Sequence, residues 1–199
     1  MRAAGAADAP RCSVHNPERL ERVFLVCFAA RYRTRLIGGA TEPLYLPAGS
    51  PRAAATDTTG QSILYYREDY FASALHEVAH WCIAGPERRL QEDFGYWYAP
   101  EGRGVDAQQR FQAVESRPQA LEWLFSLACG FPFQISFDNP GQDAEAQRPV
   151  FARAILGCAQ GWQAAGLPSR AGCFFRALGA EFGRHRPLQS LDLTLEALL

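Results

Sequence analysis

Apolar residues recur every three or four positions along several stretches of this chain, and this spacing is typical of amphipathic helices. The expected helices cover residues 18–32, 69–84, 106–115, 118–129, 145–166 and 169–184. The second of these ends at Gly85-Pro86, a common order of residues after a helix. Because proline disfavours helix at the residue before it, Pro118 predicts a break near Arg117 between the third and fourth helices.

Short apolar or alternating runs predict strands, which are expected over residues 41–47, 63–66, 94–99 and 131–137. The first and last of these predicted strands contain prolines, which favour a position at the edge of a sheet or an irregular start of the strand. Residues 48–62 are small and polar and indicate a loop or an insertion. Residues 1–17, rich in Ala, Pro and Gly, are expected to form a flexible N-terminal tail before one domain, 18–199. The predicted fold is a helix-dominated α+β domain with a small sheet.

Composition narrows the class of protein. The chain has 199 residues, of which 48% are hydrophobic and 21% charged, so it is not a wholly disordered polypeptide. All 20 basic residues are arginines and the net charge is -1, which argues against a basic nucleic-acid-binding body. No apolar run is long enough for a transmembrane helix, and the N-terminus does not resemble a secretory signal. We therefore expect a cytoplasmic protein with no membrane and no direct nucleic-acid partner.

The six cysteines refine this expectation. No two of them form a CxxC pair, so the sequence does not support a zinc knuckle or a thioredoxin-type site. Several lie within apolar runs, where cysteine behaves as a small hydrophobic residue. Free thiols in a reducing compartment are expected.

The sequence His76-Glu77-Val78-Ala79-His80 lies in the middle of the helix expected over 69–84. Residues four apart on a helix project from one face, about 6 Å apart along the axis, so both imidazoles can bind one divalent metal. Glu77 can then reach a metal-bound water. The alternative is a pair of structural histidines on a buried helix face, hydrogen-bonded to carboxylate or backbone partners.

A metal held by two histidines needs a third protein ligand. The metzincin extension is absent, because Ile83 and Pro86 stand where that class has glycine and histidine. A carboxylate from a neighbouring helix is the simplest ligand, and Glu115, beside the predicted break, is favoured over Glu122. Two histidines and one carboxylate suit zinc with a water or non-haem Fe(II) with open positions, and spacing does not choose between them.

Five longer stretches together resemble the elongation factor P hydroxylase family, over about residues 19–186. They are TRLIGG and EPLYLPA within 34–48, HEVAHWCIAGPERR at 76–89, DFGYWYAPEGR at 93–103, VESRPQALEWLF at 114–125 and GFPFQISFDN at 130–139. The family shares the HExxH helix of zinc peptidases, so the resemblance implies a zincin-like metal helix. It also implies a metal-dependent hydroxylase that acts on the modified lysine of translation elongation factor P.

The resemblance further implies a set of site residues and cofactors. His76 and His80 correspond to the metal-binding histidines of the family, and Glu115 corresponds to its acidic ligand. Fe(II) is the implied metal and O2 the co-substrate, with Glu77 next to the metal as the catalytic residue. Elongation factor P is the implied protein partner. The sequence carries no 2-oxoglutarate, flavin or phosphate-loop motif, so it does not indicate the electron donor.

The aromatic run at 94–98 has two interpretations. Tyr96 and Tyr98 alternate with Trp97, so the two tyrosines share one face of a strand and could bind a cationic lysine-derived side chain. The same run could instead pack on the core. Two further functions remain alternatives to the hydroxylase: a zinc-dependent metallopeptidase with Glu77 as its base, and a non-catalytic binding module that retains the helix for structure.

Overall fold

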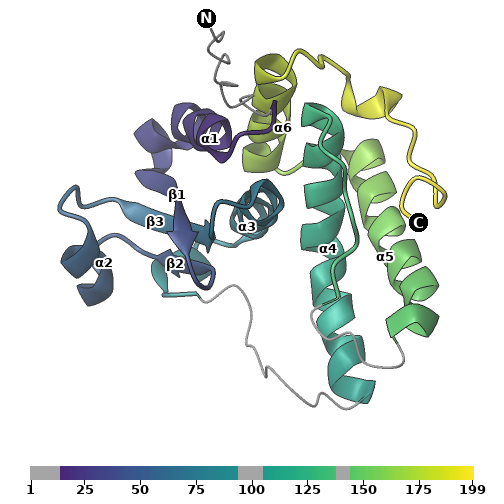
Figure 1. Ribbon diagram of the computed structural model, residues 1–199, viewed down its shortest axis with the longest axis horizontal. Helices are drawn as coiled ribbons and strands as arrows, with labels where there is room; N and C mark the ends of the chain where they lie inside the picture. The colour runs from purple at the N-terminus through teal and green to yellow at the C-terminus, as the bar shows by residue number, and fades with distance from the viewer. Residues whose placement is uncertain (1–13, 94–104, 138–143) are drawn as a thin grey trace, which may run out of the picture.

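The computed structural model describes residues 14–93, 105–137 and 144–199 (Figure 1). Its main helices are α1 (Pro17–Tyr32), α2 (Pro51–Thr56), α3 (Phe71–Ile83), α4 (Val105–Cys129), α5 (Ala144–Ala165) and α6 (Ser169–Glu181). Single 3-10 turns cover Arg88–Leu90 and Leu188–Ser190. The strands are β1 (Thr34–Ala40), β2 (Leu44–Leu46) and β3 (Ser62–Arg67). The prediction of a helix-dominated α+β fold with a small sheet is confirmed.

The three strands form one sheet in the order β1-β3-β2. β1 runs parallel to β3, with Thr34 opposite Ser62, and β2 runs antiparallel to β3, with Leu44 opposite Tyr65. β3 is therefore the central strand, and four of its six residues are buried. This small sheet gives α3 an apolar surface to pack on.

α3 lies between the sheet and α4, with α1 and α6 nearby (Figure 1). Its buried residues lie around most of its circumference, which is the pattern of a helix in the interior of a protein. They are Phe71, Ala74, Leu75, Glu77, Val78, Ala79, Trp81 and Cys82. The predicted limits 69–84 match the observed helix to within two residues, so the motif helix occupies the centre of the fold.

α4 runs without interruption through Pro118, so the predicted break near Arg117 is wrong. A proline inside a helix removes one backbone hydrogen bond and crowds the carbonyl four residues before it, at a cost of about 3 kcal/mol or more. Burial compensates here, because Pro118 and the residues after it from Gln119 to Ser126 are all buried. Glu115 and Glu122 consequently lie on one continuous helix.

Three other local predictions need correction. β1 was not expected, because Gly38 and Gly39 weaken its strand pattern. The loop expected over 48–62 contains α2, which Ser50 caps by accepting a hydrogen bond from the Ala53 N–H at 3.1 Å. Residues 131–137 form no strand, although residues alternate there. The strand expected over 94–99 lies outside the described residues.

The segment before α1 packs against the domain where it is described. The His15 ring lies 5.2 to 5.4 Å from the rings of Phe71, Phe131 and Phe182. Its Nε2 is 3.0 Å from the carbonyl oxygen of Cys129. Residues 1–13 of the predicted tail lie outside the described ranges, so the prediction of flexibility there stays a prediction.

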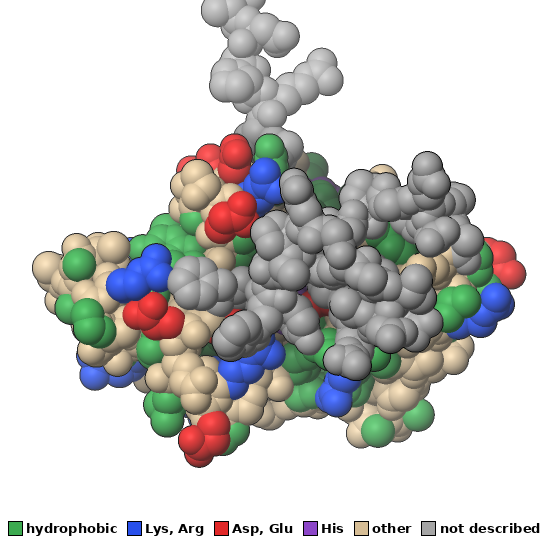
Figure 2. Space-filling view, turned by 90° about the horizontal axis from the view of Figure 1, so that it is seen from below, with side chains coloured by type: hydrophobic (Ala, Val, Ile, Leu, Met, Phe, Trp, Pro, Cys, Tyr) green, Lys and Arg blue, Asp and Glu red, His purple; other side chains and the backbone are tan. Residues whose placement is uncertain are grey.

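Arginine and acidic side chains lie beside one another at several places on the face shown in Figure 2. Ion pairs of this kind join Arg19 to Glu181 at 2.8 Å and Arg35 to Asp57 at 3.4 Å. Ion pairs at or near the surface, such as these, contribute little to stability. Within the described ranges, no helix is both long and apolar enough to cross a membrane.

Candidate metal centre

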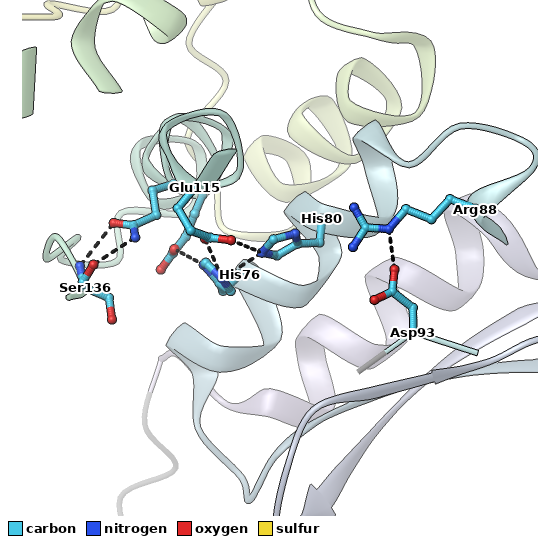
Figure 3. Close-up of polar contacts among 8 residues, drawn as sticks. His76, His80, Arg88, Asp93, Glu115 and Ser136 are labelled. Carbon is cyan, nitrogen blue, oxygen red and sulfur yellow. Dashed lines mark hydrogen bonds and ion pairs between the residues drawn. The ribbon is translucent and has the colours of Figure 1, made fainter. Parts of the chain in front are cut away.

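The two motif histidines project from α3 toward α4 (Figure 3). They stand one turn apart on the helix, and their Nε2 atoms lie 3.0 Å from each other. The side chains are partly buried, with 24% of His76 and 11% of His80 exposed. Two ring nitrogens this close either form a hydrogen bond, in which one ring carries the hydrogen, or bind the same metal ion.

Glu115 reaches this pair from α4 (Figure 3). Its carboxylate oxygens lie 3.5 Å from His76 Nε2 and 3.4 Å from His80 Nε2. An ion about 2.1 Å from each ligand atom leaves about 3.0 Å between ligands at right angles and about 3.4 Å between tetrahedral ligands. The three observed separations therefore fit one divalent ion, and the potential ligand atoms all lie within 4.8 Å of one another.

The burial of Glu115 supports the same conclusion. Its side chain is only 4% exposed, and its Oε1 atom accepts no hydrogen bond from the described residues. A buried carboxylate without a hydrogen-bond donor is costly unless a cation satisfies it. The donor set of two imidazoles and one carboxylate fits Zn²⁺ or Fe²⁺.

Glu122, the other candidate ligand, contacts the opposite nitrogen of His76. Its Oε2 lies 2.8 Å from His76 Nδ1. When Nδ1 donates its hydrogen to Glu122, the lone pair of Nε2 is left to face Glu115 and His80. The geometry thus separates the two carboxylates: Glu115 lies beside the two Nε2 atoms, and Glu122 lies at Nδ1 of His76.

A stripe of buried polar residues along α4 explains how both carboxylates face α3. Its members stand alternately three and four residues apart, so they share one side of the helix. They are Gln112, Glu115, Gln119, Glu122 and Ser126.

The middle residue of this stripe also holds the segment after α4. The Gln119 amide accepts a hydrogen bond from Ser136 N–H at 3.1 Å and donates one to Ser136 carbonyl at 2.9 Å (Figure 3). The side chain thus takes the place of a neighbouring strand for Ser136. Residues 131–137 form no regular secondary structure, and at Ser136 this side chain provides the hydrogen bonds that a strand partner would provide.

The electrostatics of the site couple the histidines to the carboxylates. Burial lowers the pKa of His76, but the hydrogen bond and charge of Glu122 outweigh it and raise that pKa to about 10. Burial raises the pKa of Glu115, yet the close contact with His80 and the charges of His80 and His76 bring it below its ordinary value. Without metal, the cluster therefore holds a proton that a metal ion would displace.

Glu77, the predicted catalytic residue, is 5% exposed and lies on α3 beside the two histidines. Burial raises its pKa, and the nearby histidines only partly counter this effect. None of the described residues donates a hydrogen bond to its carboxylate. It does not belong to the group of potential ligands formed by His76, His80 and Glu115.

Tyr96 and Tyr98, predicted to bind substrate, lie outside the described residues, and their role stays a prediction. The sequence analysis did not single out Arg88 and Asp93, which form an ion pair close to His80 (Figure 3). The role of Glu122 was missed as well. The spacing of seven residues from Glu115 is a signal that could have placed both on one helix face.

Comparison with known proteins identifies the family of this chain. A family model described as elongation factor P hydroxylase matches residues 23–192. A protein of Haemophilus influenzae named elongation factor P lysine hydroxylase is 41% identical over 166 residues, which cover 83% of this chain and 89% of that protein. The chain belongs to the elongation factor P hydroxylase family.

Proposed function

We propose that this chain hydroxylates the modified lysine side chain of elongation factor P, with O2 as co-substrate and Fe(II) held by His76, His80 and Glu115. The observation that carries the proposal is the cluster of two imidazoles and one carboxylate in a member of this family. Open positions on such a centre are available to O2 and substrate. A substrate that works in translation would place the enzyme in the cytoplasm.

The chain's own residues have distinct tasks in this proposal. When bound, Fe(II) supplies the reduction of O2 and the oxidising power to break a C–H bond. Glu122 keeps the proton of His76 on Nδ1 and so keeps Nε2 available as a ligand. Glu77 orients a group of the substrate or holds a proton next to it. Conversion of C–H and O2 to C–OH and water also consumes two electrons and two protons, which an external reductant supplies.

Metal analysis and mass spectrometry test this proposal directly. The protein is purified without air, its metal content is measured, and it is incubated with elongation factor P under air and under argon. A mass gain of one oxygen atom, only under air and only with iron, is the expected result. Iron-loaded protein that leaves elongation factor P unchanged with several reductants would contradict it.

Substitution of Glu77 separates the hydroxylase from the zinc peptidase that the HExxH motif also allows. In a peptidase the glutamate takes the proton of the attacking water, so Glu77→Gln would abolish turnover with metal still bound. In the hydroxylase we expect Glu77→Gln to bind iron and to keep O2-dependent hydroxylation, at a rate about 10–100-fold lower. Single-turnover assays under air and argon measure this. Peptide cleavage that is indifferent to O2 and lost in the variant would favour the peptidase.

A further inference from the structure

Several arginine side chains gather around Tyr32, the last residue of α1, where α1, α3 and α6 pack together (Figure 1). The guanidinium groups of Arg31, Arg89 and Arg170 lie 5.5, 5.5 and 5.6 Å from the centre of its ring. The Trp81 ring is 5.4 Å from the Tyr32 ring, and the Arg170 guanidinium is 5.0 Å from the Trp81 ring. We call Trp81, Arg89 and Arg170 the arginine–tryptophan site.

Each member of the arginine–tryptophan site has a buried N–H group without a hydrogen-bond partner among the described residues. The atoms are Nε1 of Trp81, Nε of Arg89 and Nε of Arg170. Trp81 as a whole is only 3% exposed, so bulk water does not replace the missing acceptor. Burial of a donor without an acceptor is unfavourable. Three such donors in one place therefore favour a ligand that supplies acceptor atoms.

The positive charge of the arginine–tryptophan site has no counter-charge within the described ranges. No ion pair of the described residues includes Arg89 or Arg170. Burial lowers the pKa of Arg170, and the charge of Arg89 lowers it further, because two like charges repel each other. An anion next to both guanidinium groups would remove this repulsion.

The acidic side chains near the arginine–tryptophan site have cationic neighbours of their own. Glu77 and Asp93 line the same small space as Trp81 and Arg89. Asp93 forms an ion pair with Arg88. The Glu77 carboxylate lies in the field of the two motif histidines. Neither acid is therefore the missing counter-charge of Arg89.

The space beside Trp81 and Arg89 limits the size of a ligand. Its accessible volume is about 30 Å³ and it is partly open to solvent, so it has room for about two water molecules or one carboxylate group. Hydrogen bonds fix both arginines around it. The Arg89 carbonyl accepts from the Tyr45 hydroxyl at 3.1 Å, and the Arg170 guanidinium donates to the carbonyl of Trp81 at 3.1 Å and to that of Ala84. The donors are therefore held in place before a ligand arrives.

We propose that the arginine–tryptophan site binds one carboxylate group, carried by an acidic side chain of a partner protein. A carboxylate supplies only acceptor atoms and the missing negative charge. A free carboxylate ion held by a few such bonds binds weakly, whereas one carried by a protein adds to a larger interface. Leu90, next to Arg89, is 72% exposed and offers that interface an apolar contact. Elongation factor P as the partner rests on the proposed function, but the carboxylate site does not.

Nitrogen-15 spectra of the tryptophan side chains test the site without turnover. The chain has four tryptophans, and Trp81→Phe identifies the indole signal of Trp81. The probes are sodium acetate and acetamide, a neutral molecule of similar shape, at the same ionic strength. We expect acetate to shift the Trp81 signal with a Kd on the order of 10–100 mM, and acetamide to leave it in place.

Substitution of Arg89 tests both the site and the partner. Arg89→Gln should weaken acetate binding about tenfold, because it loses a charged donor. The variant should also raise the KM for elongation factor P and leave kcat unchanged, and added salt should reduce this difference. The matched control is Arg153→Gln, at an exposed position of α5, which should change neither acetate binding nor KM.

The outcomes separate this inference from the proposed function. No acetate shift, or an equal shift with acetamide, would overturn the site and leave the hydroxylase intact. An acetate shift lost in Arg89→Gln, with normal hydroxylation at an unchanged KM, would mean that the site takes free carboxylate ions and would overturn the protein partner. A Trp81 signal that elongation factor P shifts only when Arg89 is present, in a chain that hydroxylates nothing, would support the site and contradict the proposed function.

Discussion

α3 has two sides with opposite chemistry. The side toward α4 carries His76 and His80, which meet the buried carboxylates of Glu115 and Glu122. The side toward α1 and α6 carries Trp81, whose ring lies 4.8 Å from that of Phe28 and 5.2 Å from that of Phe24. One short helix thus joins an ionisable cluster to an aromatic core.

The difference shows how the protein offsets the unfavourable free energy of burying an ionisable cluster. Buried ionisable groups lose hydration, and their mutual attraction compensates this loss only in part. Buried aromatic rings are each worth several kcal/mol when they are compared with alanine. The aromatic side therefore stabilises α3, and the polar side positions the proposed metal ligands. Substitutions on the two sides should separate metal binding from stability.

The largest expected effect is on metal retention. His76→Ala and His80→Ala should each remove most of the affinity for iron and essentially all hydroxylation, because each deletes one of three protein ligands. The folded state should survive with a loss of about 1–3 kcal/mol, since a carboxylate loses its buried partner. Metal analysis and circular dichroism measure the two effects.

The matched control is His185→Ala, the same substitution at an exposed position outside the motif. It should change neither metal content nor activity. A motif variant that keeps stoichiometric iron would show that the ligand assignment is wrong, and one that unfolds completely would indicate that the histidines are structural.

Substitutions on the aromatic side should have the reverse effect: a large loss of stability with little direct effect on metal binding. Phe28→Ala is expected to lower the free energy of unfolding by about 3–5 kcal/mol, because Phe28 is 1% exposed and leaves a cavity among large rings. Val26→Ala, on the same helix but 84% exposed, should change it by less than about 0.5 kcal/mol. Urea unfolding measures both. If Phe28→Ala removed metal while the free energy of unfolding stayed unchanged, the aromatic side of α3 would contribute to metal binding rather than to stability, and the proposed division between the two sides would be wrong.

The two carboxylates of the polar side should differ from each other. Glu115→Gln should lose iron, because a neutral amide is a poor ligand for Fe(II). Glu122→Gln should retain iron with an affinity about 10–100-fold lower, because it only ceases to orient His76. Titration of both variants with Fe(II) under argon decides between them, and the reverse order would make Glu122 the ligand.

The smallest effect concerns pH. The raised pKa of His76, about 10 against an ordinary 6.5, means that its proton stabilises the metal-free folded state. That contribution is complete below about pH 6.5 and is lost as the pH rises toward 10. The metal-free protein should therefore lose stability between pH 6.5 and 8.5, whereas iron affinity should rise over the same range.

Glu122→Gln tests the cause of this pH dependence. It removes the main contact that raises the pKa of His76, so the fall in stability with pH should become shallower in the variant. Urea unfolding of both metal-free proteins at several pH values provides the comparison. Identical slopes would show that His76 is not the titrating group.

Prediction from sequence succeeded where neighbouring residues decide the structure and failed where distant ones do. α1, α3, α5 and α6 were expected within a few residues, because each has a clear apolar period. The break at Pro118 was wrong because burial of the surrounding helix outweighs the local cost of proline. The segment 131–137 has the apolar period of a strand, but it lies outside the sheet and Ser136 takes its backbone hydrogen bonds from the Gln119 side chain.

The same division applies to the site. Residues four apart on a helix have one possible arrangement, so the sequence alone determined that His76 and His80 would share a face and could bind one ion. The choice between Glu115 and Glu122 depended on how α4 packs against α3. They are seven residues apart on one helix face, so the helical repeat predicts the same orientation for both side chains and does not distinguish the ligand. Only the packed structure brings Glu115 to the two Nε2 atoms and Glu122 to Nδ1 of His76, because contacts between helices depend on the whole core.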